Sequence, residues 1–444
     1  MARKAIVTIL LAATFAVAAV LFWTASGGKA GPPNVLVILI DTLRADHMSL
    51  YGYERKTTPN LDLFGEENLV FERAMSAAAW TPPSVASIFT GMYASVHGHM
   101  PLRSETSYGK RNTKLDDSFH TLGELFKGAG YATALISANP LINRRFGFAQ
   151  GFDTFISPGR ERGAKVNRRA MKYLSDLWPR EKPFFLYLQY MDPHDPYEAP
   201  APYDAEFSGP LAAREYDEKE LALIGAYDGE IKYVDAKIGE LFDWLKSEGL
   251  YEDTIIVIFS DHGEQFMERG YQGHADRVYS EEIHVPLIIK APGLKGRIAE
   301  VVSLIDVYPT LSELSGAQFT HTVHGLSLIS QLQARKGKGV LAEIIRHHNE
   351  KGYLRPNGEK LITLYPMERG LTGHSPGPIS EQYFDLNKDP FELAPLPDAA
   401  VLEKLRSEYE AEYSEILRSK EGYTVGETEL DDKTLKQLKT LGYL

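Results

Sequence analysis

Three uninterrupted apolar runs, each closed by acidic or imidazole side chains, constrain the fold of this chain more than any other feature. The runs are Asn34 to Ile40, Phe184 to Tyr190 and Thr254 to Phe259. Such runs are typical of strands that are buried on both faces of a parallel sheet. Ligand sites in these sheets lie at the carboxyl ends of the strands. We therefore expect the polar residues that follow the runs to share one edge of a sheet.

Amphipathic helical patterns alternate with these runs. Two further segments, Tyr131 to Ile136 and Val285 to Ile289, also have the composition of buried strands. Strands that alternate with helices predict an α/β fold, here a doubly wound, mostly parallel sheet flanked by helices. The predicted helices begin at Thr58-Pro59 and cover Leu122 to Lys127, Arg162 to Trp178, Glu218 to Leu250 and Ile305 to Leu314.

The pattern changes after about residue 318, where short strand-like segments replace the long alternation. These segments are Val340 to Ile345, Tyr353 to Tyr365 folded back at Asn357-Gly358, and Gln382 to Leu386. They predict a small antiparallel sheet. Helical patterns at 402–417 and 432–441 follow it, and 370–378 is expected to form a loop. We divide the chain into an N-terminal segment (1–33), a main domain (34–318) and a C-terminal antiparallel subdomain (319–444).

The N-terminal segment has the pattern of an export signal or a membrane anchor. Arg3 and Lys4 precede an apolar stretch from Ala5 to Trp23, and small residues follow as far as Gly31. The apolar stretch is long enough to cross a bilayer as a transmembrane helix, and the small residues permit cleavage without requiring it. A buried core helix is the alternative. We expect the rest of the chain to work outside the cytoplasm, either secreted or at the extracytoplasmic (periplasmic) face of the membrane.

The composition argues against a nucleic-acid partner and excludes thiol chemistry. The formal net charge of −12 argues against a nucleic-acid partner, which normally meets a basic surface. The chain has no Cys, so it has neither a thiolate metal site nor a thiol nucleophile. An anionic substrate must therefore be handled locally, by a metal ion or by a few His and Lys side chains.

A hydroxyl stands at the start of a predicted helix within the segment Ala79 to Gly91. Thr81 precedes Pro82 and Pro83, which favour a first helical turn, and the spaced apolar residues Val85, Ile88 and Phe89 follow. A helix N-terminus attracts anions, so a phosphate or sulfate ester is expected to dock against the Thr81 hydroxyl. The alternative is that Thr81 only caps the helix.

Four side chains that follow predicted strands or begin this helix form a candidate metal site. Asp41, Thr81, Asp261 and His262 offer the hard donors suited to one divalent cation, namely Mg²⁺, Mn²⁺, Ca²⁺ or Zn²⁺. Such a cation activates the Thr81 hydroxyl as a covalent nucleophile and neutralises the substrate.

Two histidines complete the predicted catalytic set. His194 follows the second apolar run, and His274 lies in the segment Gly-Tyr-Gln-Gly-His. We expect them to hold ester oxygens or to protonate the leaving group. The alternative for each is a structural or merely exposed imidazole.

These motifs together resemble the sulfatase family of the alkaline phosphatase superfamily, from Asn34 to the C-terminus. The resemblance implies an alkaline phosphatase-like sheet domain with a smaller C-terminal antiparallel subdomain. It also implies hydrolysis or transfer of sulfate or phosphate esters at a metal-bound nucleophile. The matching motifs are Asn34 to Arg44, the segment Thr81 to Gly91, Asp192-Pro193-His194, Asp261-His262-Gly263, Tyr383 to Leu386 and Asp389-Pro390.

The chain departs from the sulfatase pattern at four positions. Thr81 occupies the position of the Cys or Ser that sulfatases oxidise to formylglycine, and it cannot form that aldehyde; Ser84 lies elsewhere in the motif. Val85 replaces the family's Arg, Ser137 to Pro140 lacks the family's Lys, and Thr42 replaces the second Asp of an acidic pair. The retained set is similar to relatives that use an unmodified Thr and one metal, such as phosphoethanolamine transferases and lipoteichoic acid synthase-like phosphoglycerol transferases.

Three hypotheses follow for the function. The first is a metal-dependent phosphoester hydrolase or phosphotransferase that acts on an anionic ester, for example of an envelope lipid or glycan. The second is a sulfuric ester hydrolase that works without formylglycine. The third is a non-catalytic protein that binds a glycan or an envelope polymer.

Overall fold

The computed structural model describes residues 31–99, 111–177, 181–212, 216–334, 338–346, 348–366, 380–429, 431 and 436. Within them, an eight-stranded sheet runs in the order β11-β2-β10-β7-β1-β6-β4-β5. Its five strands from β7 to β5 pair in parallel: β7 (Thr254–Phe259), β1 (Asn34–Ile40), β6 (Phe184–Tyr190), β4 (Ala132–Ser137) and β5 (Thr154–Ile156). The predicted mostly parallel α/β sheet is confirmed.

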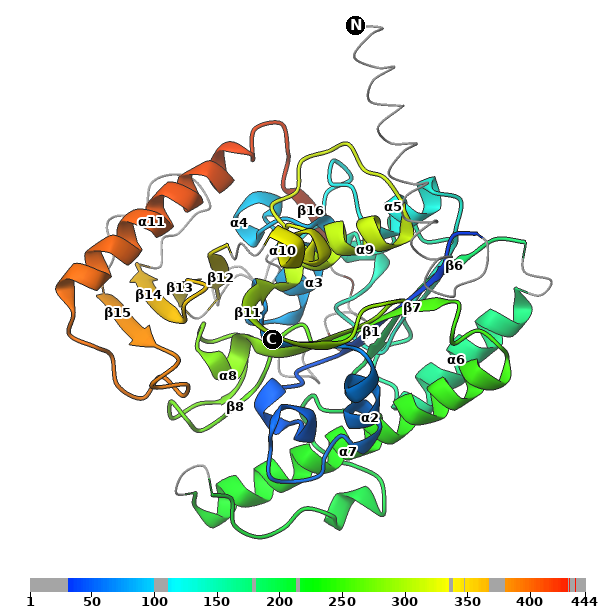
Figure 1. The fold of residues 1–444 in the computed structure, drawn as a ribbon, viewed down its shortest axis with the longest axis horizontal. Coiled ribbons are helices and arrows are strands. Elements are labelled where there is room, and N and C mark those ends of the chain that lie inside the picture. The colour runs from blue at the N-terminus through cyan, green and yellow to red at the C-terminus, as the bar shows by residue number, and fades with distance from the viewer. Residues whose placement is uncertain are drawn as a thin grey trace, which may run out of the picture.

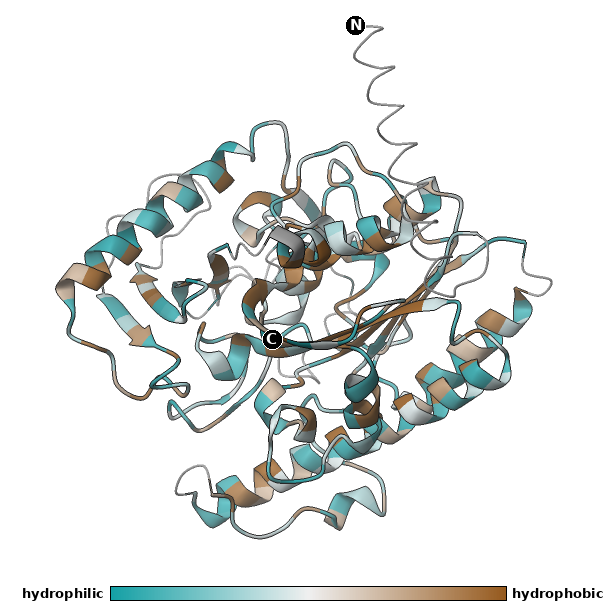
Figure 2. Cartoon of the chain, in the orientation of Figure 1, coloured by the Kyte–Doolittle hydropathy of each residue, from teal (hydrophilic) through white to brown (hydrophobic). Residues whose placement is uncertain are grey.

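Strand β1 lies at the centre of the sheet and contributes to a core on each face. Alternate side chains of a strand point to opposite faces, and the two sets of β1 belong to two different hydrophobic clusters. Helices α3 (Thr81–Thr90), α5 (Leu122–Gly128) and α9 (Val307–Ser315) cover one face. Helices α2 (Pro59–Glu67), α6 (Gly163–Asp176) and α7 (Glu218–Ser247) cover the other (Figure 1). Figure 2 shows hydrophobic strands inside and hydrophilic outer helix faces, as this burial requires.

The other edge of the sheet differs from the sequence prediction. The predicted strand at 285–289 is present as β10 (His284–Lys290), but it runs antiparallel to both of its neighbours. Strands β2 (Leu69–Met75) and β11 (Gly296–Ser303) were not predicted. In β2 the charged pair Glu72-Arg73 interrupts the apolar run, and the first half of the edge strand β11 is largely exposed. Neither strand therefore has the uniform apolar pattern of a central strand.

A second, smaller sheet follows the main one in the chain. It is antiparallel throughout, in the order β12 (Val340–Ile345), β13 (Asn349–Leu354), β14 (Glu359–Tyr365) and β15 (Ser380–Asp385), and α11 (Ala399–Arg418) packs against it (Figure 1). The predicted antiparallel C-terminal sheet is confirmed, although β13 begins four residues before the predicted start at Tyr353.

Short elements complete the described fold. Strand β16 (Gly426–Glu429) pairs with β3 (Arg111–Lys114), which brings the end of the described chain back beside the main sheet's helices. A two-residue hairpin, β8 (Gln265–Phe266) with β9 (Gln272–Gly273), follows β7. The remaining helices are α4 (Ala94–His97), α8 (Ser280–Ile283) and α10 (Leu328–Ala334), with 3₁₀ turns at Ala45–His47, Ser49–Tyr51, Arg144–Phe146, Tyr203–Ala205 and Leu304–Asp306.

Three sequence predictions lie outside the described residues and stay predictions. They are the N-terminal export or anchor segment, apart from residues 31–33, the loop at 370–378, and the closing helix at 432–441, apart from Lys436. Among the helices that the structure describes, none has the length and apolarity that a bilayer span needs.

Candidate active site

The ends of β1 and β7 and the start of α3 form the candidate site. Asp41 directly follows β1, and its backbone N–H donates to the Tyr190 carbonyl at the end of β6 (2.9 Å). Asp261 and His262 follow β7 after one residue. Thr42 has a φ of 58°, which a β-branched residue rarely adopts. Such backbone strain is typical of functional sites, and here it adjoins the carboxylate of Asp41.

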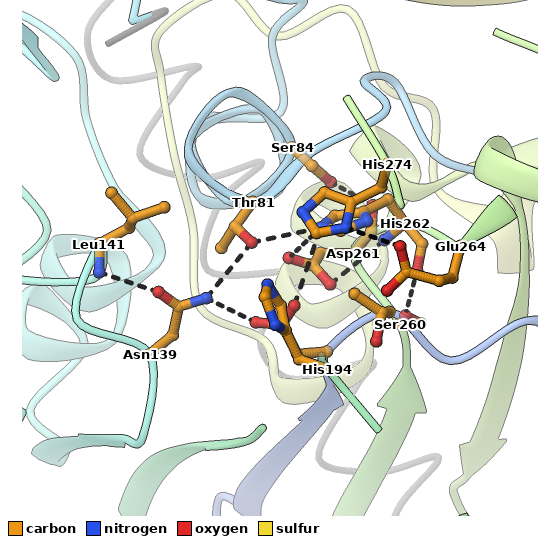
Figure 3. Close-up of polar contacts among 12 residues, drawn as sticks. Thr81, Ser84, Asn139, Leu141, His194, Ser260, Asp261, His262, Glu264 and His274 are labelled. Carbon is orange, nitrogen blue, oxygen red and sulfur yellow. Dashed lines mark hydrogen bonds and ion pairs between the residues drawn. The ribbon is translucent and has the colours of Figure 1, made fainter. Parts of the chain in front are cut away.

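The four predicted metal donors converge, and all of them are buried. One ligand atom from each of Asp41, Asp261 and His262 lies within 4.8 Å of the others. His262 Nε2 lies 3.7 Å from Asp41 Oδ1, 3.6 Å from Asp261 Oδ2 and 3.2 Å from Thr81 Oγ1 (Figure 3). Side chains from three distant segments of the chain, at Asp41, Thr81 and Asp261-His262, therefore face one point.

The hydrogen bonds of His262 determine which ring nitrogen faces this point as an acceptor. Its Nδ1 lies 2.9 Å from the Gly263 carbonyl oxygen, which can only accept a hydrogen bond. Nδ1 therefore carries the proton, and burial lowers the pKa of His262, which keeps the ring neutral. Nε2 then presents a lone pair to the two acids and to Thr81.

The two carboxyl groups are held in a state that favours a cation between them. Asp41 Oδ1 and Asp261 Oδ2 are buried without a hydrogen-bond partner among the described residues. Burial raises the pKa of each carboxyl to about 7, and the proximity of Asp261 adds to the shift of Asp41. Ligand-to-cation distances of about 2.0–2.6 Å place neighbouring ligand atoms about 3–4 Å apart. The donor set and its spacing thus fit one divalent cation.

Two amide side chains that the sequence analysis missed complete this centre. Asn139 Nδ2 donates to Asp41 Oδ2 (2.7 Å) and to Thr81 Oγ1 (3.3 Å), as Figure 3 shows for Thr81. Gln189 Nε2 donates to the same Asp41 oxygen (2.8 Å). In the sequence, the segment Ser137 to Pro140 stands out only because it lacks the Lys of the sulfatase motif. The position of Asn139 could have identified it as a site residue, because Asn139 follows a parallel strand at the same edge of the sheet as Asp41.

Thr81 is the first residue of α3, and the N-cap position belongs to Trp80. The Thr81 hydroxyl faces His262 and Asn139, so the interpretation that Thr81 only caps the helix is wrong. Pro82 and Pro83 have no N–H to offer. At this terminus the helix therefore supplies the positive end of its dipole and the Thr81 hydroxyl, and not a set of free amides.

Both predicted catalytic histidines lie beside the cluster. The His274 ring centroid is 4.4 Å from that of His262 and 5.0 Å from that of His194. Burial lowers the pKa of His194 and His274 well below 6.5, so both are neutral near pH 7. Glu264, which the sequence analysis did not select, lies with Oε1 3.0 Å from His274 Nδ1 (Figure 3). Burial raises the pKa of Glu264 to about 8.

Neighbours of Thr81 on α3 carry no charge toward the site. Ser84 Oγ donates to the Asp261 carbonyl (2.7 Å) and so fixes the end of β7 against the helix. Val85 is fully buried in the core. The position that holds an Arg in the sulfatase motif is therefore apolar here.

Fold and site together place the protein among the alkaline phosphatase-like hydrolases, and comparison with known proteins narrows this class to one family. The Sulfatase family model matches residues 33–317. The chain belongs to the sulfatase family.

Individual relatives agree with this assignment. The chain is 26% identical to an arylsulfatase of Clostridium perfringens, over 92% of this chain and 99% of that protein. It is 25% identical to a Delta 4,5-hexuronate-2-O-sulfatase of Bacteroides thetaiotaomicron, over 88% and 90% of the two chains. The crystal structure of the phosphonate monoester hydrolase of Agrobacterium radiobacter has the same fold, with a TM-score of 0.68 at 19% identity over 87% of this chain and 96% of that chain.

Proposed function

We propose that the protein is a metal-dependent hydrolase or transferase of phosphate or sulfate esters, with Thr81 as the covalent nucleophile. One observation carries the proposal. Two carboxylate oxygens that have no hydrogen-bond partner in the described part of the chain, and the lone pair of His262 Nε2, face the Thr81 hydroxyl in a buried cluster. Acid pairs that lack a cation are unfavourable when buried, so this arrangement suits a site built to hold one.

Asp41, Asp261, His262 and Thr81 would hold the cation, whether Mn²⁺, Mg²⁺, Ca²⁺ or Zn²⁺. When bound, it would neutralise negative charge on the ester and lower the pKa of the Thr81 hydroxyl. Asn139 orients the same centre from the other side, because its amide donates both to Asp41 and to Thr81.

In the proposed reaction, the Thr81 hydroxyl loses its proton to solvent, and Oγ1 attacks the phosphorus or sulfur of the ester. The bond between that atom and the alcohol oxygen breaks, and the alcohol leaves. Water or an acceptor alcohol then releases the esterified Thr81. Phosphate is the favoured ester because Thr81 cannot form the formylglycine of typical sulfatases.

The two other histidines have different hydrogen-bonding states and so suit different roles. Because the pKa of Glu264 is raised to about 8, this carboxyl carries a proton near pH 7 and donates to His274 Nδ1. His274 Nε2–H is then a donor, suited to the leaving oxygen. His194 Nδ1 donates to the Asp195 carbonyl (2.7 Å), so its Nε2 is an acceptor, suited to the incoming water or alcohol.

The alcohol part of the substrate is proposed to be a glycan or an envelope lipid. The relative named as a hexuronate-2-O-sulfatase supports a sugar ester. The predicted N-terminal signal or anchor supports a substrate outside the cytoplasm, at the membrane or in the cell envelope.

The test compares turnover of aryl phosphodiester, phosphomonoester and sulfate esters with Mn²⁺, Mg²⁺, Ca²⁺, Zn²⁺ or EDTA. We expect turnover with metal, none with EDTA, and a loss in Thr81→Ala of about 10³-fold or more in kcat. Thr90→Ala is the matched control, because Thr90 lies on the same helix and its hydroxyl bonds only to nearby backbone, donating to the Ala86 carbonyl and accepting from the Met92 N–H. Mass spectrometry of acid-quenched protein should locate the ester adduct on Thr81.

The outcomes separate the three hypotheses. Turnover of sulfate esters alone would favour the sulfuric ester hydrolase. Binding of these esters without turnover, across all four metals, would favour the non-catalytic protein. Wild-type rates in Thr81→Ala would exclude the assigned nucleophile.

A further inference from the structure

The loop that carries His194 follows β6 and is fixed to a helix at each of its ends. At its start, Asp192 Oδ1 accepts a hydrogen bond from the backbone N–H of Gly163, the first residue of α6 (3.1 Å). At its other end, the Glu198 backbone N–H donates to Glu230 Oε1 of α7 (2.7 Å). The middle of the loop, which includes His194, has a support of another kind.

Arg160, three residues before α6, holds the middle of this loop with its guanidinium group. Its Nη1 donates to the Asp195 carbonyl (2.6 Å), and its Nη2 donates to the carbonyls of His194 (2.9 Å) and Pro196 (2.7 Å). Three consecutive carbonyl groups thus converge on one side chain, which suits the planar fork of donors that arginine offers. The backbone on both sides of His194 is therefore held by Arg160.

The Asp195 carbonyl connects Arg160 to the His194 ring. His194 Nδ1 lies 2.7 Å from this oxygen, which can only accept a hydrogen bond, so Nδ1 carries the proton. A carbonyl oxygen has two lone pairs and accepts from the imidazole and from the guanidinium together. Arg160 therefore holds the acceptor that sets both the tautomer and the orientation of the His194 ring.

The charge of Arg160 acts on His194 in the same sense. Burial and the neighbouring His274 lower the pKa of His194, and the positive charge of Arg160 lowers it further. The ring is therefore neutral near pH 7, with the proton on Nδ1 and a lone pair on Nε2.

Arg160 reaches the candidate centre only through His194. The His194 ring centroid is 5.0 Å from that of His274, which is 4.4 Å from that of His262 (Figure 3). His194 is buried, whereas Arg160 is half-buried. The contacts of Arg160 with the loop are to backbone carbonyls and leave the reacting atoms to the histidine.

We propose that Arg160 is the positioning residue of His194, holding the Asp195 carbonyl so that His194 Nε2 accepts the proton of the molecule that releases the Thr81 ester. The inference rests on the proposed function for the role of His194. In this step the oxygen of the incoming water or alcohol bonds to the phosphorus or sulfur, and its proton moves to His194 Nε2. The bond from that atom to Thr81 Oγ1 breaks, and its electron pair stays on Oγ1. Oγ1 then takes up a proton from solvent, and His194 returns one to solvent.

The kinetic test measures formation and release of the Thr81 ester separately, with an aryl phosphodiester and the metal that supports turnover. Arg160→Ala should liberate the first equivalent of phenol at a rate within about threefold of wild type, because attack by Thr81 does not use His194. Its steady-state rate should fall about 10–100-fold, by analogy with residues that orient metal-bound histidines. Mass spectrometry of acid-quenched protein should then find more ester on Thr81 in the variant than in wild type.

Rescue shows whether the donors of Arg160 are responsible. Arg160→Lys keeps the charge and should recover part of the steady-state rate; it also carries the comparison if Arg160→Ala does not fold. Guanidinium chloride, below the concentrations that unfold the protein, should accelerate release in Arg160→Ala, because a half-buried position can be reached from solvent. Arg169→Ala is the control, since its guanidinium is paired with Glu161 (2.8 Å), and it should change neither step.

Two kinetic outcomes would overturn the proposal. Equal losses in formation and in release would mean that Arg160 supports the fold of the whole site. A wild-type steady-state rate in Arg160→Ala would mean that His194 keeps its orientation without the guanidinium.

Nitrogen NMR of the histidine rings separates this inference from the proposed function, because it needs no turnover. In protein labelled with ¹⁵N-histidine, the His194 signals are those that disappear in His194→Gln. Wild type should show a protonated Nδ1 and an unprotonated Nε2, and Arg160→Ala should show exchange between the two tautomers. A different tautomer in wild type, or unchanged His194 signals in Arg160→Ala, would refute the inference. If no ester is turned over, the proposed function fails and these signals alone decide the inference.

Discussion

At the scale of single residues, the candidate centre concentrates uncompensated charge. Asp41 and Asp261 are fully buried, each has one oxygen without a hydrogen-bond partner among the described residues, and the side chains that face these oxygens are an imidazole and a hydroxyl. Amide donors from Asn139 and Gln189 hold only the second oxygen of Asp41. With the cation of the proposed function absent, this arrangement lowers the stability of the folded protein.

This arrangement predicts how metal-free stability depends on pH. The pKa of Asp41 rises from 3.8 to about 7 on folding, so the folded protein holds more protons than the unfolded chain between these values. The contribution to stability is full below pH 3.8 and is lost as pH rises toward 7. In EDTA, Asp41→Asn should therefore be more stable than wild type at pH 8 by about 2 kcal/mol, and the gap should close toward pH 4.

Calorimetric unfolding at pH 4, 6 and 8 measures this difference. Mn²⁺ should raise the Tm of wild type and not that of Asp41→Asn, because only the folded wild type binds the ion tightly. Asp243→Asn is the control, since its side chain is 83% exposed. A difference between Asp41→Asn and wild type that does not grow from pH 4 to pH 8 in EDTA would contradict the expected sign.

At the scale of elements, one carboxylate of helix α7 fixes the start of helix α2. Asp235 of α7 accepts from the backbone N–H groups of Asn60 (3.0 Å) and Leu61 (2.9 Å), which are the first donors of α2. Thr58, at the N-cap of α2, makes no capping bond with its side chain. The start of α2 thus depends on a residue 174 positions away, and no local sequence pattern reveals it.

Removing this distant cap should destabilise the fold without touching the site. We expect Asp235→Ala to lose about 2 kcal/mol of unfolding free energy, because two buried helix donors lose their acceptor. Urea denaturation measures the change, with Asp243→Ala on the exposed face of the same helix as control. A loss no larger than that of the control would show that α2 does not need the cap.

At the scale of the whole molecule, one buried carboxylate, that of Glu343, connects the C-terminal sheet to the main domain. Glu343 and Lys351 pair between β12 and β13, and Glu343 Oε2 also accepts from the Ser95 N–H (2.9 Å) at the start of α4. Both side chains are buried.

Breaking this pair on one side should be costly. Glu343→Leu leaves the Lys351 ammonium buried beside the Tyr413 ring without its carboxylate partner, and we expect a loss of about 3 kcal/mol or more of unfolding free energy. The double variant Glu343→Leu/Lys351→Met should recover most of it, because no charge then remains buried. Denaturant unfolding of both variants measures this, with the exposed pair Lys172–Asp176 as control: Asp176→Ala should change stability by less than about 0.5 kcal/mol. If the double variant is as unstable as the single one, the loss of stability comes from altered side-chain packing and not from the unpaired charge.

The sequence by itself determined the central strands and the main donors of the site. Strands β1, β6 and β7 are buried on both faces, so their apolar runs are continuous and their ends are sharp. Asp41 and Asp261-His262 follow such ends, and Thr81 precedes two prolines that start a helix. Each of these patterns lies within a short segment of the chain. Because the strands end at one edge of a parallel sheet, the residues that follow them become neighbours in space.

Only the tertiary structure decided the features that depend on partners far away in the chain. The antiparallel direction of β10, the presence of β2 and the edge position of β11 follow from which strand pairs with which, and the apolar patterns of these strands do not encode it. The contacts of Asn139, Gln189 and Glu264 with the candidate site depend on which side chains lie opposite them, and these come from other segments of the chain. The chemistry of a side chain is set by its own residue type, whereas contacts between distant segments form only when the whole chain packs.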